Sequence, residues 1–111
     1  MGCNHKNKTI MIYPDFSSSG VWCECGASFG NPKSKFSHVP EGLFELVQLW
    51  NDYWEEVSFN DHPSYLDGVT LEITKHHEDR IISMGKELYK IISKYNSCIF
   101  VEDNCRINLK A

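Results

Sequence analysis

The strongest pattern in the chain is an apolar stripe that begins after Pro40 and recurs at steps of three and four residues. Its members are Leu43, Leu46, Val47, Trp50, Tyr53, Trp54 and Val57. Polar residues fill the other side of the segment, namely Glu45, Gln48, Asn51, Asp52 and Glu55. This period predicts an amphipathic helix. Pro40 suits its first turn, and the stretch 60–63 ends it because Pro63 disfavours helical angles in the residue before it.

A second stripe follows Thr74, which is a good N-cap, and ends near Asn96. It consists of Ile81, Gly85, Leu88, Ile92 and Tyr95, with Ile82 and Tyr89 beside it. Apolar and polar residues alternate just before this stripe, which predicts a short strand over 69–73. A helix through 64–74 is the alternative that the pattern leaves open.

Shorter segments with strand character occupy both ends of the chain. Residues 9–13 and 21–23 are β-branched or aromatic and flank a loop rich in serine, so they predict a hairpin. Residues 25–29 are expected to extend its second strand, and 30–38 form a linker. Residues 97–101 and 105–109 predict two further strands around a turn at 102–104.

The net charge of −4 is unevenly distributed along the 111 residues. Residues 39–79 carry ten carboxylates against Lys75 alone, a net charge of −9, whereas both flanking segments are weakly basic. Such a segment favours basic partners and repels phosphate, although a solvated helix face is the simpler interpretation. No apolar run is long enough to span a membrane, and the polar N-terminus does not resemble a secretory signal, so we expect a cytoplasmic protein.

Four residues near the N-terminus have the spacing of metal ligands: Cys3-x-His5, then seventeen residues, then Cys23-x-Cys25. Two residues with a single residue between them point to the same face of an extended segment, and a hairpin brings the two pairs together. Four thiolate or imidazole ligands predict a closed, structural Zn²⁺ site, and Gly26 suits a tight turn beside it. Thiols that bind no metal, another metal or a redox role are the alternatives.

Residues 3–29 resemble a zinc ribbon or zinc knuckle, in which two short ligand pairs on hairpin-linked segments clamp one zinc ion. Those families usually have two residues between paired ligands, whereas both pairs here have one. The resemblance implies that zinc orders the hairpin.

The predicted fold is α+β: an N-terminal zinc-clamped β-hairpin plus two amphipathic helices packed on a small mixed sheet. That sheet is expected to contain residues 69–73, 98–101 and 105–109. The hairpin module and linker span 1–38 and the α+β domain spans 39–111, and the two are expected to form one compact unit.

Other side chains that carry chemistry have simpler interpretations. His76 and His77 are expected in a solvated first helical turn. His38 either replaces one of the four zinc ligands or lies in the linker. Cys98 and Cys105 are expected to be small core residues rather than a disulfide. The helical aromatic residues are expected in the core.

The chain lacks a nucleophile elbow, a phosphate-binding loop and a paired-carboxylate motif, so we expect no enzyme. The predicted function is that of a small non-catalytic zinc-binding protein acting through protein–protein contacts, as an inhibitor, adaptor or immunity-like protein. Its acidic central region would face a basic partner. The alternative is a nucleic-acid-binding regulator that uses the basic zinc module. Its candidate contacts are Lys6, Lys8, Lys33 and Lys35, with Trp22 or Phe29 stacking on bases.

Overall fold

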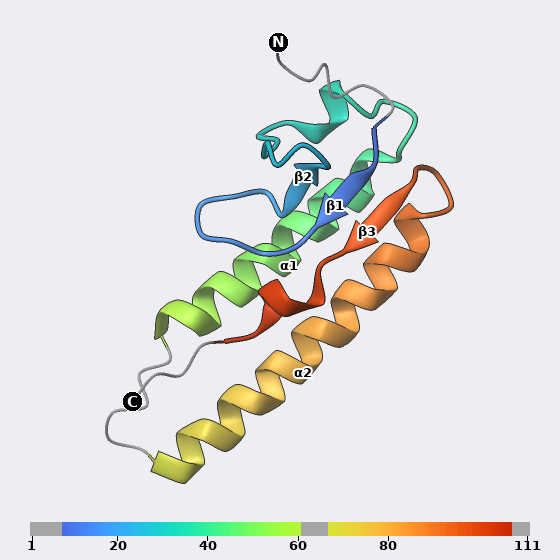
Figure 1. The fold of residues 1–111 in the computed structure, drawn as a ribbon. Helices are drawn as coiled ribbons and strands as arrows, with labels where there is room; N and C mark the ends of the chain where they lie inside the picture. The colour runs from blue at the N-terminus through green and yellow to red at the C-terminus, as the bar shows by residue number, and fades with distance from the viewer. Residues whose placement is uncertain (1–7, 61–66, 108–111) are drawn as a thin grey trace.

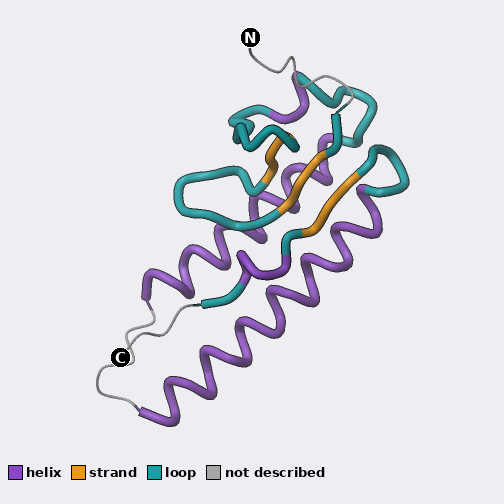
Figure 2. Tube along the Cα trace, in the orientation of Figure 1, coloured by secondary structure: helices purple, strands orange, loops and turns teal. Residues whose placement is uncertain are grey.

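Two helices pack against a three-stranded sheet in the computed structural model, which describes residues 8–60 and 67–107 (Figure 1). The helices are α1 (Glu41–Asn60) and α2 (Asp67–Ile92). The strands are β1 (Ile10–Ile12), β2 (Val21–Cys23) and β3 (Cys98–Phe100). Two short 3-10 helices complete the structure: η1 (Pro32–Ser34) lies between β2 and α1, and η2 (Glu102–Cys105) follows β3 (Figure 2). The predicted α+β class, with two helices and a small mixed sheet, is confirmed.

The sheet has the order β2-β1-β3, with β1 antiparallel to β2 and parallel to β3. Its register creates two rows whose β1 and β2 members are fully buried: Cys23–Ile10–Cys98 and Val21–Ile12–Phe100. The alternate row, Trp22–Met11–Ile99, is more exposed. One face of the sheet therefore packs against the helices, and the other carries a partly exposed apolar row.

The core is one apolar cluster that draws on both ends of the described chain, from Ile10 to Ile107. Trp50 lies at its centre with 1% of its surface exposed, and its indole Nε1 donates a hydrogen bond to the carbonyl oxygen of Ile81 at 2.8 Å. This bond ties α1 to α2. The expected core role of the helical aromatic residues is confirmed for Phe44, Trp50 and Trp54.

Asn51 was predicted on the polar side of α1, and this is wrong because it is fully buried. Its Oδ1 accepts hydrogen bonds from the Asp15 backbone N–H (2.9 Å) and the Ser18 hydroxyl (3.1 Å). Its Nδ2 donates to the carbonyl oxygens of Asp15 (3.1 Å) and Ser18 (3.0 Å). Buried amides need such partners, and here they fasten the β1–β2 loop to α1.

The predicted strand over 69–73 is wrong, because α2 begins at Asp67 and includes this segment. Thr74 therefore lies within the helix and is not its N-cap. Extending a formed helix adds one backbone hydrogen bond for each residue fixed, and an alternation over only five residues is a weak competing signal. α2 ends at Ile92, and a turn follows before β3.

The predicted strand over 105–109 is also wrong for the residues that the structure describes. Cys105 ends η2, and the backbone N–H of Ile107 donates to the Glu78 Oε2 of α2 at 3.5 Å. Cys105 and Ile107 are both buried and Arg106 between them is exposed. This alternation of apolar and polar residues reflects packing on the core rather than pairing in a sheet. Residues 108 and 109 lie outside the described residues. The strand that pairs with β3 is therefore β1, and not residues 105–109.

Within the described part of the chain, neither helix combines the length and apolar character needed to cross a membrane.

Candidate functional site

The candidate metal centre begins where β2 ends, at a tight turn that contains two of the four predicted ligands. The backbone N–H of Cys23 donates to the Ala27 carbonyl oxygen at 2.8 Å, and that of Gly26 donates to the Cys23 carbonyl oxygen at 2.8 Å. Gly26 has a φ of +97°, a conformation that glycine adopts without strain. The expected role of Gly26 in a tight turn is thus confirmed.

The two cysteines occupy different environments in this turn. Cys23 is fully buried, while Cys25 lies in the turn and is exposed. The prediction that residues 25–29 extend β2 is wrong, because the turn reverses the chain and returns it to pair with Trp22 at Ser28. The shared strand face inferred for the pair Cys23 and Cys25 therefore does not form, and the turn itself determines where Cys25 lies.

The other two predicted ligands, Cys3 and His5, lie outside the described residues. The chain emerges from that segment directly beside the turn, as reciprocal contacts of Thr9 and Glu24 show. The Thr9 N–H donates to Glu24 Oε1 at 3.2 Å, and the Glu24 N–H donates to the Thr9 carbonyl oxygen at 3.2 Å. Within the described residues, no group of three or more His, Cys, Asp or Glu side chains could hold a metal ion.

His38 lies beside the segment between α2 and β3. Its Nε2 is 2.8 Å from Asn96 Oδ1, and the Nδ2 of Asn96 donates to the Lys8 carbonyl oxygen at 2.9 Å. His38 thus helps to connect the linker, the segment after α2 and the start of β1.

His76 and His77 are not in a first helical turn, because α2 begins nine residues earlier, at Asp67. His77 lies against Tyr53 of α1, with its Nδ1 2.6 Å from the tyrosine hydroxyl. The rings meet edge to face at 5.7 Å. This pair adds a polar contact between the helices, while His76 is exposed.

Cys105 is a buried core residue, as expected, whereas Cys98 is half-buried and packs against the core; neither forms a disulfide. Burial raises the pKa of each thiol to about 12, and the carboxylates of Glu102 and Glu78 add to the effect at Cys105. A thiol with such a pKa is almost wholly protonated at neutral pH, which makes it a poor nucleophile.

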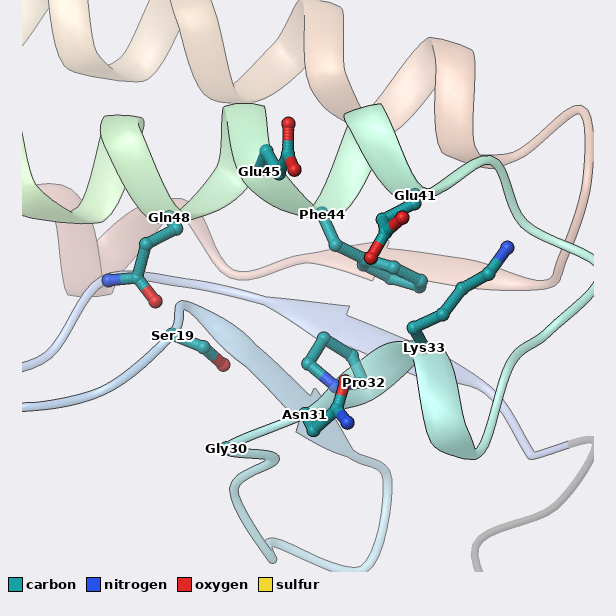
Figure 3. Close-up of a pocket in the computed structure, with 9 residues that line it drawn as sticks. All are labelled: Ser19, Gly30, Asn31, Pro32, Lys33, Glu41, Phe44, Glu45 and Gln48. Carbon is teal, nitrogen blue, oxygen red and sulfur yellow. The ribbon is translucent and has the colours of Figure 1, made fainter.

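A shallow cavity of about 210 Å³ lies between the first turns of α1 and the segment before η1 (Figure 3). Glu41 and Glu45 belong to α1 on one side of it, and Lys33 belongs to η1 on the other. The Lys33 ammonium donates to the carbonyl oxygens of Ser37 (3.1 Å) and Val39 (2.9 Å). No thiol or imidazole belongs to its nine lining residues, so the hollow offers none of the ligands expected of the zinc site.

Sequence reasoning missed a second concave feature, a groove of about 280 Å³ between α1 and α2. Its lining residues are Leu46, Trp50, Ser83, Met84, Glu87, Leu88 and Ile91. Leu46 was assigned to the apolar stripe of α1, yet 49% of its surface is exposed. The position of Leu46 at the edge of that stripe is the sequence feature that could have indicated an exposed apolar residue beside the core.

No protein-family model, curated protein or solved structure matches this chain.

Proposed function

We propose that this chain is a small, non-catalytic zinc-binding protein that acts through protein–protein contacts, with its acidic helix α1 facing a basic partner. The observation that carries the proposal is the charge of α1. It contains five carboxylates and no lysine or arginine over its twenty residues. These are Glu41, Glu45, Asp52, Glu55 and Glu56, and their spacing gathers them on one stripe of the helix.

One carboxylate of the stripe, Glu55, has a structural role. The simpler interpretation, that the stripe is only a solvated helix face, can therefore apply to the other carboxylates but not to Glu55. Glu55 Oε1 accepts a hydrogen bond from the Ser17 N–H at 3.0 Å and thereby holds the β1–β2 loop. Glu41, Glu45 and Glu56 are exposed. A stripe of one sign attracts a basic surface and accelerates its association.

The proposed structural Zn²⁺ site uses Cys3, His5, Cys23 and Cys25. Thiolates and imidazole are the ligands that Zn²⁺ prefers, so the chemistry of the donor set fits. Thr9 is fastened beside the Cys23–Cys25 turn, four residues after His5 and six after Cys3. An extended chain spans about 3.5 Å per residue, so both can reach the turn. Zinc would then tie the segment before β1 to the end of β2.

Metal analysis of the purified protein tests the zinc site. We expect about one equivalent of zinc per chain, and loss of both metal and fold on treatment with a chelator. Cys25→Ala should abolish zinc binding, whereas Cys98→Ala, the matched control outside the site, should retain it. Less than about half an equivalent of zinc, with a fold that resists the chelator, would refute this part of the proposal.

A salt series with two probes tests the mode of action. A lysine-rich, unstructured peptide should bind, and its affinity should fall as salt rises. Glu45→Gln combined with Glu56→Gln should weaken it, whereas Asp103→Asn, at an exposed position of η2, should not. Binding of a random-sequence oligonucleotide with a steep negative salt slope would favour the nucleic-acid alternative instead.

That alternative has less support from the described residues. The Lys33 ammonium already donates to two carbonyl groups, and the Trp22 ring stacks on Tyr13 with centroids 4.5 Å apart.

A further inference from the structure

The groove between α1 and α2 lies on the side of the helix pair that faces away from the sheet. The opposite side of α1 holds the β1–β2 loop through Asn51, and the opposite side of α2 carries β3 and η2 (Figure 1). Trp50, Leu88 and Met84 contribute to the lining of the groove. Leu46, which lines the groove, is 49% exposed, and Leu49, three residues further along α1 and next to the groove rather than in its lining, is 64% exposed.

Exposed apolar side chains that are scattered singly need no explanation, but these are contiguous. Leu46 and Leu49 are neighbours on one helix, and Met84 and Ile91 are exposed on the facing helix. Apolar side chains of α1 and α2 thus form a continuous strip along the groove between the two helices. Such a strip matches the apolar face of a third helix. Methionine adapts easily to the shape of such a partner.

The charges beside the groove are asymmetric. The acidic stripe of α1 runs alongside Leu49, with Glu45 and Glu56 exposed and no base in the helix. On the α2 side, the Glu87 carboxylate is balanced by the Lys90 ammonium at 3.2 Å. A ligand in the groove would therefore experience a negative field from the α1 edge and little net field from the paired charges on α2.

We propose that this groove binds an amphipathic helix of a partner protein, with lysine or arginine along the edge that faces α1. The inference rests on the proposed function, because it specifies that the segment of the basic partner that binds is a helix. The apolar residues of the ligand helix, spaced at three and four positions, pack on Leu46, Leu49, Met84 and Ile91. A second copy of this chain fits less well, because its own α1 would bring a second acidic stripe to the acidic edge.

The experiment uses a labelled synthetic peptide of about 18 residues, which forms a helix of about 27 Å. It carries leucine at the helical spacing and lysine on one edge, and fluorescence anisotropy measures its affinity for the full-length protein. A scrambled peptide of the same composition keeps the charge and loses the apolar face. We expect the designed peptide to bind at least about tenfold more tightly than the scrambled one.

Leu46→Ser combined with Leu49→Ser should weaken binding of the designed peptide by about tenfold or more, with the circular dichroism spectrum retained. Ile99→Ser is the matched control, since Ile99 is 48% exposed on the outer face of the sheet, and it should change binding by less than about twofold. Glu45→Gln combined with Glu56→Gln should weaken binding and flatten its dependence on salt.

The possible failures of this inference and of the proposed function are distinguishable. Equal binding of the designed and scrambled peptides, unaffected by the leucine substitutions, would overturn the groove while leaving the acidic surface intact. Absence of binding by either peptide at about 1 mM would overturn both. A dimer in solution that the leucine substitutions convert to a monomer would make a second copy the occupant, and would also overturn the inference.

Discussion

Replacing Gly85 by alanine places a methyl group where two aromatic rings already lie. A Cβ atom at this position would be 2.5 Å and 2.7 Å from Cε1 and Cζ of Phe100, and 2.8 Å from Cζ2 of Trp50. Carbon atoms in contact are normally about 3.5–4.0 Å apart, so both rings or the helix itself have to shift, by about 1 Å at the closest contact. Trp50 is buried and hydrogen-bonded to Ile81, which leaves Phe100 as the ring with more freedom.

Two opposing effects determine the sign of the change in stability. Alanine is favoured over glycine inside a helix by about 1 kcal/mol. Overpacking a well-packed core costs about 1–3 kcal/mol, and the close approach to two rings places this site toward the upper end. We therefore expect Gly85→Ala to lower the free energy of unfolding by about 1–2 kcal/mol.

Urea unfolding followed by circular dichroism measures this difference, and the slope with denaturant should not change. Gly42→Ala is the control, because a Cβ at Gly42 meets nothing within 4 Å and should leave stability unchanged or slightly raised. Phe100→Leu should partly relieve the strain in the Gly85→Ala background, giving a coupling energy of about 1 kcal/mol. A Gly85→Ala protein as stable as the original, with no coupling to Phe100, would refute the reasoning.

Three further changes test other parts of the structure. Asn51→Ala removes four hydrogen bonds from a buried site, and we expect it to lower the free energy of unfolding by about 2–4 kcal/mol in urea; a loss below about 1 kcal/mol would contradict the role of this amide. The pKa of the Cys98 and Cys105 thiols is about 12 in the folded protein, against an ordinary value of 9.0. Their contribution to the free energy of unfolding is therefore complete below pH 9. It is lost as pH rises from 9 to 12, because the unfolded chain releases these protons first. Stability measured across that range should fall less steeply when both are replaced by alanine, and an unchanged slope would count against buried thiols. Glu78→Gln breaks the 3.1 Å ion pair with the half-exposed Arg106 and should cost about 0.5–1 kcal/mol at low salt, less at 1 M salt; a cost independent of salt would indicate lost packing instead.

Helical periodicity predicted α1 closely and the later part of α2, because each has a continuous apolar stripe that packs against the rest of the protein. The first hairpin was also predictable from two β-branched segments around a serine-rich loop. The partner of β3 was not. Its pairing with β1 depends on where α2 returns the chain, and no local pattern in 97–101 specifies a strand so distant in sequence.

The candidate site was predictable in its residue types and less so in its geometry. The spacing of Cys23 and Cys25 was visible, but the turn that separates their environments depends on Gly26 and on backbone hydrogen bonds to Ala27. Asn51 shows the same limit: its position on the helix appears polar, and only the loop packed on it explains its burial. The groove arises from two helices together, so neither stripe alone reveals it.

The parallel pairing of β1 and β3 has a consequence for the order in which the protein folds. Thr9 and Ser97, at the ends of these strands, lie 88 positions apart in sequence and are joined by a hydrogen bond between their hydroxyls. On a ribosome, β1 is synthesised early, yet it gains its second neighbour only after both helices have emerged. Until then one edge of β1 presents unpaired backbone groups, which can recruit strands of other chains. Shortening the chain before β3 should therefore promote aggregation, even if the hairpin and both helices are left complete.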